Sequence, residues 1–318
     1  MSLRIVYMGT PDFAVAPLEA LLDAGCNVVG VVTNPDKPAG RGQKVQEAAV
    51  KKFAAEKDLP ILQPEKFRNE EFLADLKALK ADLQVVVAFK MLPEVVWNMP
   101  KFGTLNLHAS LLPQYRGAAP INWAIINGDK ETGVSTFLLQ HEIDTGNILF
   151  QEKVSIGDND NAEIIHDKLM NIGAELVVKT VKAIESGECP QIPQDSFDVD
   201  VLKPAPKIFK EDCKIDWTKD IDSIHNLIRG LSPYPAAWTE LLPNGEGKKI
   251  GLKVFATEKE VKNHSEESGT LFTDGKSYLK VAVKGGFISI KTLQQAGKKR
   301  MKIEDFLRGF QQISNYHL

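Results

Sequence analysis

The chain has 318 residues, of which 43% are hydrophobic and 25% are charged, a composition typical of globular proteins in water. This length suits one large domain or two ordinary ones, and no apolar run is long enough for a membrane-spanning helix. The net charge of −3 is unevenly distributed. Residues 1–204 carry 20 Lys and Arg against 28 Asp and Glu, a net of −8, whereas residues 205–318 carry 19 against 14, a net of +5. A basic second half suggests contact with a polyanion, although a solvated lysine-rich surface has the same composition.

The beginning of the chain and its cysteines indicate the cellular compartment in which the protein is expected. Residues 2–7 lead directly into a predicted strand, so we expect no signal peptide and a cytoplasmic location. Cys26, Cys189 and Cys213 are isolated and lack metal-ligand spacing. They fit a reducing environment and argue against zinc and disulfides. We therefore expect no metal and no membrane partner, and we expect a monomer.

The first 126 residues alternate between predicted strands and helices. The predicted strands are Arg4–Met8, Asn27–Thr33, Pro60–Leu62, Leu83–Ala88 and Gly103–His108. The predicted helices are Phe13–Leu22, Glu47–Glu56, Glu70–Leu79 and Pro120–Ile126, and Asn34–Gln43 is a predicted loop. This rhythm predicts an α/β fold with a Rossmann-like, doubly wound, mostly parallel sheet. Such sheets bind ligands at the carboxyl ends of their strands.

The remaining chain changes character after a long predicted helix. Strands are predicted at Thr132–Leu139 and Ile148–Val154, and an amphipathic helix at Ala162–Ser186. A proline-rich linker is predicted at residues 190–208, and one more helix at Ile221–Leu231. Short strands separated by Gly, Asn and Asp then predict a small OB-like β-barrel. The predicted organisation is therefore a first domain at 1–189, a linker at 190–208 and a C-terminal domain at 209–318.

Asn106, His108 and Asp144 are the strongest candidates for chemistry. The first two alternate with apolar residues in the predicted strand Gly103–His108, so both point to one face of the sheet. An irregular loop, Ser110–Gly117, follows at once, and Asp144 lies in a second predicted loop. A hydrogen-bond donor, a titratable ring and a carboxylate suit acyl transfer through an oxyanion. The alternatives are a strand-end amide that caps a loop, a core histidine and a turn-forming aspartate.

Other motifs are weaker. Gly9-Thr10-Pro11 follows the first strand but lacks the full glycine fingerprint of dinucleotide-binding proteins. Asp144-Thr145-Gly146 matches a fragment of aspartic proteases, but the sequence holds no second copy. A Ser110 nucleophile beside His108 is conceivable, yet no nucleophile elbow surrounds Ser110.

Residues 103–120, Gly-Thr-Leu-Asn-Leu-His-Ala-Ser-Leu-Leu-Pro-Gln-Tyr-Arg-Gly-Ala-Ala-Pro, resemble the signature of enzymes that take formyl from 10-formyltetrahydrofolate. Asn106, His108 and Asp144 match the catalytic trio of that family one by one. Four more segments resemble the methionyl-tRNA formyltransferase family: Tyr7–Phe13, Asn34–Gly42, Leu231–Trp238 and Gly297–Met301. The resemblance therefore covers both predicted domains. One departure follows Gly42, where the family commonly has a Ser-Pro pair and this chain has Gln46-Glu47-Ala48-Ala49.

The resemblance implies a reaction and roles for the trio. The enzyme would transfer the formyl group of 10-formyltetrahydrofolate, its cosubstrate, to the α-amine of initiator methionyl-tRNA, which gives N-formylmethionyl-tRNA for translation initiation. Asn106 and His108 would hold the oxyanion. Asp144 would orient the imidazole or accept a proton from the amine. Residues 1–189 would then be the catalytic domain and 209–318 a tRNA-binding domain.

The resemblance also implies residues that bind folate and tRNA. Ser110, Leu111, Leu112 and Pro113 should border the folate. Phe89, Met91 and Leu92 could line an apolar slot for its pterin, or could be ordinary core. The expected tRNA contacts are Arg41 with its neighbours Lys37 and Lys44, and the basic cluster Lys298, Lys299 and Arg300.

Related reactions remain as alternatives. Enzymes with the same trio formylate glycinamide ribonucleotide or a sugar nucleotide amine, and a related domain hydrolyses formyltetrahydrofolate. The C-terminal domain and the loop with Arg41 favour tRNA over these. A homologue that only binds tRNA or folate is a further alternative, against which the complete trio argues.

Overall fold

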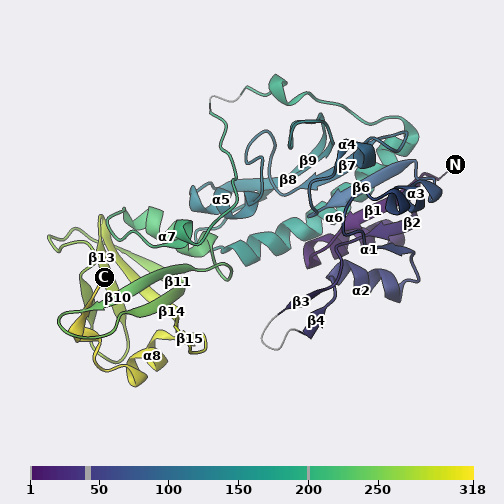
Figure 1. The fold of residues 1–318 in the computed structure, drawn as a ribbon. Coiled ribbons are helices and arrows are strands. Elements are labelled where there is room, and N and C mark those ends of the chain that lie inside the picture. Colours follow the sequence, from purple (N-terminus) through teal and green to yellow (C-terminus); the bar gives the residue numbers. More distant parts are fainter. Residues whose placement is uncertain (1, 40–43, 199–200) are drawn as a thin grey trace. The chain divides into compact units, whose positions relative to one another are not determined.

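The computed structural model describes residues 2–39, 44–198 and 201–318. These form two compact units, which are shown in Figure 1. Unit 1 contains residues 1–117, 132–154 and 166–204, and unit 2 contains residues 118–131, 155–165 and 205–318. The domain boundaries expected from the sequence, at 1–189 and 209–318, stay a prediction.

The centre of unit 1 is a sheet with the strand order β5-β2-β1-β6-β7-β8-β9. The strands are β1 (Arg4–Gly9), β2 (Asn27–Val32), β5 (Ile61–Leu62), β6 (Leu83–Val87), β7 (Thr104–His108), β8 (Glu131–Leu138) and β9 (Ile148–Ser155). The pairs from β5 to β7 are parallel, and β8 runs antiparallel to β7. The central strands are buried apolar runs because helices cover both faces of such a sheet. The predicted Rossmann-like, mostly parallel fold is confirmed.

The helices of unit 1 follow the predicted order, with local differences. They are η1 (Asp12–Ala14), α1 (Val15–Asp23), α2 (Ala49–Glu56), α3 (Glu70–Ala78), α4 (Glu94–Trp97), α6 (Ala162–Ser186) and η2 (Gln194–Ser196). The first predicted helix begins as a 3-10 turn, and α4 was not predicted. Asn69 caps α3, since its Oδ1 accepts the Phe72 amide at 3.2 Å. A Cβ at Gly173 of α6 would lie 2.8 Å from Leu107 Cδ2, so glycine lets α6 pack closely on β7.

A short hairpin lies where the sequence predicted a loop. Strands β3 (Lys37–Ala39) and β4 (Lys44–Gln46) pair antiparallel, with Pro38 opposite Val45. Residues 40–43 between them, including Arg41, lie outside the described part of the chain. The hairpin was missed because each strand is only three residues long and the segment is rich in Pro and Gly.

Unit 2 is built around an antiparallel, barrel-like sheet with the order β12-β13-β14-β11-β10-β16, to which β15 adds on β14. Its strands are β10 (Ala237–Pro243), β11 (Ile250–Val261), β12 (Leu271–Thr273), β13 (Leu279–Val283), β14 (Gly286–Gln295), β15 (Met301–Lys302) and β16 (Tyr316–His317). Its helices are α5 (Pro120–Ile126), η3 (Glu211–Cys213), α7 (Ile221–Gly230), α8 (Ile303–Gly309) and η4 (Ile313–Asn315). The predicted C-terminal barrel is confirmed, whereas α8 and the short strands β15 and β16 were not predicted.

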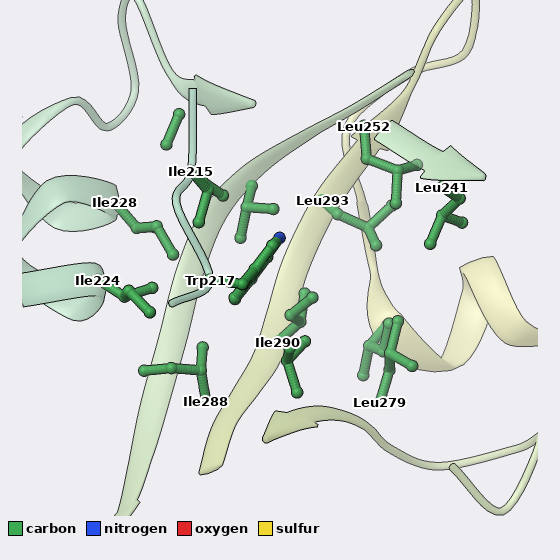
Figure 2. Close-up of a cluster of buried hydrophobic side chains, with 14 of the residues drawn as sticks. Ile215, Trp217, Ile224, Ile228, Leu241, Leu252, Leu279, Ile288, Ile290 and Leu293 are labelled. Carbon is green, nitrogen blue, oxygen red and sulfur yellow. The ribbon is translucent and has the colours of Figure 1, made fainter. Parts of the chain in front are cut away.

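The core of unit 2 is apolar (Figure 2). Ile288 and Ile290 of β14 are two residues apart and both point into this core, as the two-residue period of a strand requires. Trp217 lies among them, and its indole N–H donates to Thr239 Oγ1 at 3.0 Å. The one polar atom of this large side chain is therefore satisfied within the core.

Two buried polar side chains of α7 hold the segment 155–165 within unit 2. Arg229 Nη1 donates to the carbonyl oxygens of Gly157 at 3.1 Å and Asp160 at 2.8 Å. His225 Nε2 donates to the Asp158 carbonyl at 3.3 Å, and its Nδ1 lies 2.9 Å from Thr257 Oγ1. Because the Thr257 hydroxyl can donate to Nδ1, these contacts fit a neutral imidazole that donates through Nε2.

His225 should therefore make the stability of unit 2 depend on pH. Burial lowers its pKa below the ordinary value of 6.5, the charges of Lys259 and Arg229 lower it further, and the Asp158 carbonyl and Asp222 oppose the shift. The unfolded state thus binds the extra proton first, and stability falls as pH drops below about 6.5. We expect the free energy of unfolding, measured with urea and tryptophan fluorescence, to decrease from about pH 7.5 to about pH 5.5. The decrease should be smaller in His225→Gln, and an equal decrease in both proteins would contradict the assignment.

Candidate active site

Asn106 and His108 lie in β7 and face the same side of the sheet, as predicted. Phe137 of β8 is paired with Asn106, and its ring lies 6.5 Å from the His108 ring, centre to centre, in an edge-to-face arrangement. The Asn106 side chain is half-buried, and it has no hydrogen-bond partner within the described part of the chain. An amide in this setting can donate to a bound ligand without first breaking a bond inside the protein.

His108 is buried, with 7% of its surface exposed, and polar atoms lie near both of its ring nitrogens. Its Nε2 lies 2.8 Å from the carbonyl oxygen of Tyr115, and because a carbonyl oxygen only accepts, Nε2 carries a proton. Its Nδ1 lies 3.8 Å from Asp144 Oδ2, within the range of an ion pair but beyond a hydrogen bond. Nδ1 is therefore the ring nitrogen that faces the Asp144 carboxylate.

Asp144 lies in the loop that follows β8, and backbone geometry brings it to His108. Its φ is +56°, in the left-handed region that few non-glycine residues adopt. Its Oδ2 accepts the amide N–H of Gly117 at 3.0 Å, which joins this loop to the loop after β7. Gly146 closes the turn, since a Cβ there would lie 1.7 Å from the Leu138 carbonyl oxygen. The three predicted residues are thus brought together in unit 1.

The loop after β7 is held by hydrogen bonds from the side chains of Ser110, Ser135 and Gln151. Ser110 Oγ donates to the Gln114 carbonyl at 2.6 Å, and Ser135 Oγ donates to the Ser110 carbonyl at 2.6 Å. Gln151 Nε2 donates to the Leu112 carbonyl at 2.9 Å and to Ser135 Oγ at 2.8 Å. The Ser110 hydroxyl therefore has a structural bond, and among the contacts of the described residues none pairs it with His108 as a nucleophile would require.

The residues predicted to bind folate are found on two loops of unit 1. Ser110, Leu112 and Pro113 are buried, and Leu111 is half-buried. After β6, Leu92 is buried in an apolar cluster on which Phe89 packs, whereas Met91 is 74% exposed. Contact between these seven side chains and folate stays a prediction.

The residues predicted to bind tRNA are divided between the units. Arg41 lies outside the described residues, and Lys37 and Lys44 are in the β3–β4 hairpin of unit 1. Lys298, Lys299 and Arg300 are exposed and connect β14 to β15 in unit 2. The Arg300 guanidinium carbon lies 4.4 Å from the centre of the Phe255 ring, so this arginine is partly held by a cation–π contact. Their contacts with tRNA stay predictions.

Metal-binding clusters and membrane-spanning helices are both absent from the described residues. In residues 2–39, 44–198 and 201–318, no group of three or more His, Cys, Asp or Glu side chains is arranged to hold a metal ion. Among the same residues, no helix is both long and apolar enough to cross a membrane.

Sequence reasoning missed three residues that contact the trio or support it. Tyr115 supplies the carbonyl bonded to His108, and Gln194 Nε2 donates to the Asp144 carbonyl at 2.8 Å. Arg116 in turn donates to Gln194 Oε1, from Nη2 at 2.7 Å and from Nε at 3.0 Å. Arg116 precedes Gly117 in the predicted loop Ser110–Gly117. Gln194, in contrast, lies in the predicted linker, 50 positions from Asp144. No spacing in the sequence indicates a bond over that separation.

Comparison with known proteins adds to this geometry. Residues 3–181 match the family described as formyl transferase, and residues 207–311 match the formyl transferase C-terminal domain. The chain is 59% identical to a methionyl-tRNA formyltransferase of Bacteroides fragilis over 309 residues, 97% of this chain and 95% of that protein. It is also 59% identical to one of Parabacteroides distasonis over 317 residues, 99% and 98% of the two chains.

A solved structure shares the fold. It is that of an N-formyltransferase from Helicobacter canadensis, in complex with folinic acid and dTDP-3-aminofucose. The TM-score is 0.64 at 19% sequence identity, and the match covers 94% of this chain and 100% of that one.

Proposed function

This chain is an enzyme of the formyl transferase family, and we propose that it transfers the formyl group of 10-formyltetrahydrofolate to the α-amine of initiator methionyl-tRNA. The observation that carries the proposal is the trio: the half-buried Asn106 amide without a partner among the described residues, His108 on the same face, and Asp144 3.8 Å from the His108 ring. The names of the Bacteroides fragilis and Parabacteroides distasonis relatives, at 59% identity, support tRNA as the acceptor.

The chemistry begins when the free amine attacks the formyl carbon. The C–N bond that forms places negative charge on the formyl oxygen, and the bond from carbon to the folate N10 then breaks. In our proposal the Asn106 amide donates to that oxygen. Because the described residues offer this amide no partner, the donor is already in place when the charge develops, which is how an oxyanion site lowers the barrier.

His108 and Asp144 handle the protons in this proposal. Since Nε2 is bonded to the Tyr115 carbonyl, the reactive position of His108 is Nδ1. A proton on Nδ1 can be donated to the oxyanion or to the departing folate nitrogen, and the Asp144 carboxylate stabilises the charged ring. Asp144 can also accept, through water, the proton that the attacking amine releases.

The residues present suit folate as the formyl donor. A pterin and its benzoyl group need apolar side chains beside a few polar groups. Met91 is exposed on the loop after β6, and Leu111 is half-buried on the loop after β7 that also carries the His108 contact. We propose that Ser110–Pro113 border the folate and that Phe89, Met91 and Leu92 line the pterin slot.

The basic cluster Lys298, Lys299 and Arg300 should contribute affinity for tRNA that depends on salt. Their charges are exposed and can follow a phosphate backbone. We expect the triple change to glutamine to weaken tRNA binding and to reduce the salt dependence by about one unit of slope for each phosphate that is no longer neutralised. Filter binding between about 50 mM and about 200 mM salt measures this. Glutamine at the exposed Lys57, Lys80 and Lys101 of unit 1 is the control, and an unchanged slope in the cluster variant would exclude the cluster from the contact.

Arg41 should affect the rate of formylation and the preference for initiator tRNA. In our proposal its guanidinium enters the acceptor end of the tRNA and positions the methionine amine. Arg41→Ala should therefore lose single-turnover rate and the preference for initiator tRNA, with a smaller change in salt slope than the cluster variant. Formylation at the wild-type rate with the wild-type preference would show that Arg41 does not recognise the acceptor end of initiator tRNA.

One experiment separates formyl transfer from the hydrolytic and binding alternatives. Purified protein is mixed with 10-formyltetrahydrofolate, with and without charged initiator tRNA, and tetrahydrofolate release is followed by absorbance. We expect release only when charged tRNA is present. Release without an acceptor would indicate a hydrolase, and no release under either condition would indicate a protein that only binds its ligands.

A further inference from the structure

The segment predicted to be a linker is hydrogen-bonded to both loops of the candidate active site. At one end Ile192 pairs with Ile148 through two backbone bonds of 2.8 and 2.9 Å. At the other end the Lys203 carbonyl accepts the Tyr115 amide at 2.7 Å. We call residues 192–198 and 201–203 the strap. The strap holds the loop that carries Asp144 at its first end and the loop that contacts His108 at its second.

Gln194 is a buried polar residue of the strap whose side chain bonds the loop that carries Asp144. Its side chain is 5% exposed, and every polar position of its amide has a partner. The amide nitrogen donates to the carbonyl oxygens of Asp144 and Gly146, at 2.8 Å each. The amide oxygen accepts two bonds from Arg116, at 2.7 and 3.0 Å. One side chain thus joins the strap, the Asp144 loop and the loop after β7.

This network acts on the backbone of Asp144. That residue holds a φ of +56°, which is unfavourable for a side chain with a Cβ and must be maintained by its surroundings. The Gln194 amide bonds the carbonyls on both sides of Thr145, so it fixes the turn that sets the direction of the Asp144 side chain. Arg116 fixes the orientation of the amide, because its N–H groups can only meet the oxygen of Gln194.

We propose that Gln194 is a positioning residue for formyl transfer: it holds the Asp144 carboxylate in place against His108. This proposal rests on the role given to Asp144 above. Placement within a fraction of an ångström matters here because Oδ2 already lies 3.8 Å from Nδ1, and a displacement of about 1 Å can cost about 10²-fold in rate. The competing explanation is that Gln194 only adds stability to a turn.

Two substitutions separate these explanations. Gln194→Met keeps the length of the side chain and removes all four hydrogen bonds. Gln194→Glu keeps the acceptor for Arg116 but places a carboxylate oxygen against the carbonyls of Asp144 and Gly146. We expect both variants to lower kcat by about tenfold to 100-fold and to leave KM for folate and for charged tRNA within about twofold.

Thr180→Val is the control for the loss of buried hydrogen bonds. Thr180 is fully buried on α6, where its hydroxyl donates to the Leu176 carbonyl at 2.7 Å and lies 2.9 Å from Thr136 Oγ1. Thr136 is paired with Leu107, whose side chain points away from the face that carries Asn106 and His108. The contact between Thr136 and Thr180 therefore lies on the opposite face of the sheet. We expect Thr180→Val to lower the unfolding temperature and to keep wild-type kcat.

A double-mutant cycle with Asp144→Asn gives the decisive comparison, under single-turnover conditions with excess enzyme. If Gln194 acts through Asp144, Gln194→Met should change the rate of Asp144→Asn by less than about twofold. If the rate loss of the double variant were the product of the two single losses, the positioning role would be overturned. Wild-type kcat in Gln194→Glu would overturn it as well. Wild-type kcat in Asp144→Asn alone would instead overturn the proposed role of Asp144, so the two failures are distinguishable.

Discussion

Replacing Asn106 with alanine is expected to lower kcat by about 10²- to 10³-fold, the usual loss when an oxyanion site loses one donor. The amide stands half-buried on β7 with no partner among the described residues, so its removal leaves no broken bond inside the protein. The variant should therefore fold normally and still bind folate. The measurement is steady-state formylation together with folate binding by fluorescence quenching.

Asn69→Ala is the matched control for this loss. It makes the same chemical change in unit 1, where it removes the cap of α3, and it should reduce stability by about 1 kcal/mol without affecting kcat. Near-normal turnover in Asn106→Ala would remove Asn106 from the mechanism. A parallel loss of folate binding would make it a binding residue.

Asp144→Asn is expected to show the second large effect, with kcat reduced by about 10²-fold or more and substrate affinity almost unchanged. Asparagine keeps the shape of the side chain, and its amide oxygen can still accept the Gly117 N–H. What it removes is the negative charge 3.8 Å from His108 Nδ1. The proton on Nδ1 then loses its stabilising partner when the ring is charged.

The division of the loss between kcat and KM gives a second test of this charge. If only KM changed in this variant, Asp144 would act in binding, and the proton-handling role would be wrong.

Periodic features of the sequence predicted much of the fold. The helix predicted at residues 162–186 has the same bounds in the structure, because its apolar residues repeat at helical spacing and Gly187, with a φ of +78°, ends it. Asn106 and His108 could be placed on one face for a similar reason, since alternation along a strand determines side-chain direction.

Features that depend on partners distant in the sequence were not predictable in this way. The bond from Gln194 to Asp144 spans 50 positions, and nothing local distinguishes this glutamine from others in a proline-rich segment. Asp144, whose φ is positive, is likewise bonded to Gly117 and Gln194, and Gly146 of the same turn lies close to β8. The distance between Asp144 and His108 follows from these contacts, so the sequence could name the trio but not its geometry.

The most direct test of the central claim is the identity of the acceptor. Purified protein is given 10-formyltetrahydrofolate with an isotope-labelled formyl group and, in separate reactions, charged initiator tRNA, charged elongator methionyl-tRNA, glycinamide ribonucleotide and an amino-sugar nucleotide. Single-turnover rates and the mass of each product are then measured. We predict labelled N-formylmethionine on initiator tRNA, at a rate at least about 10²-fold above that of every other amine. Label transferred faster to the ribonucleotide or the sugar, or to none of the four, would contradict the proposed function.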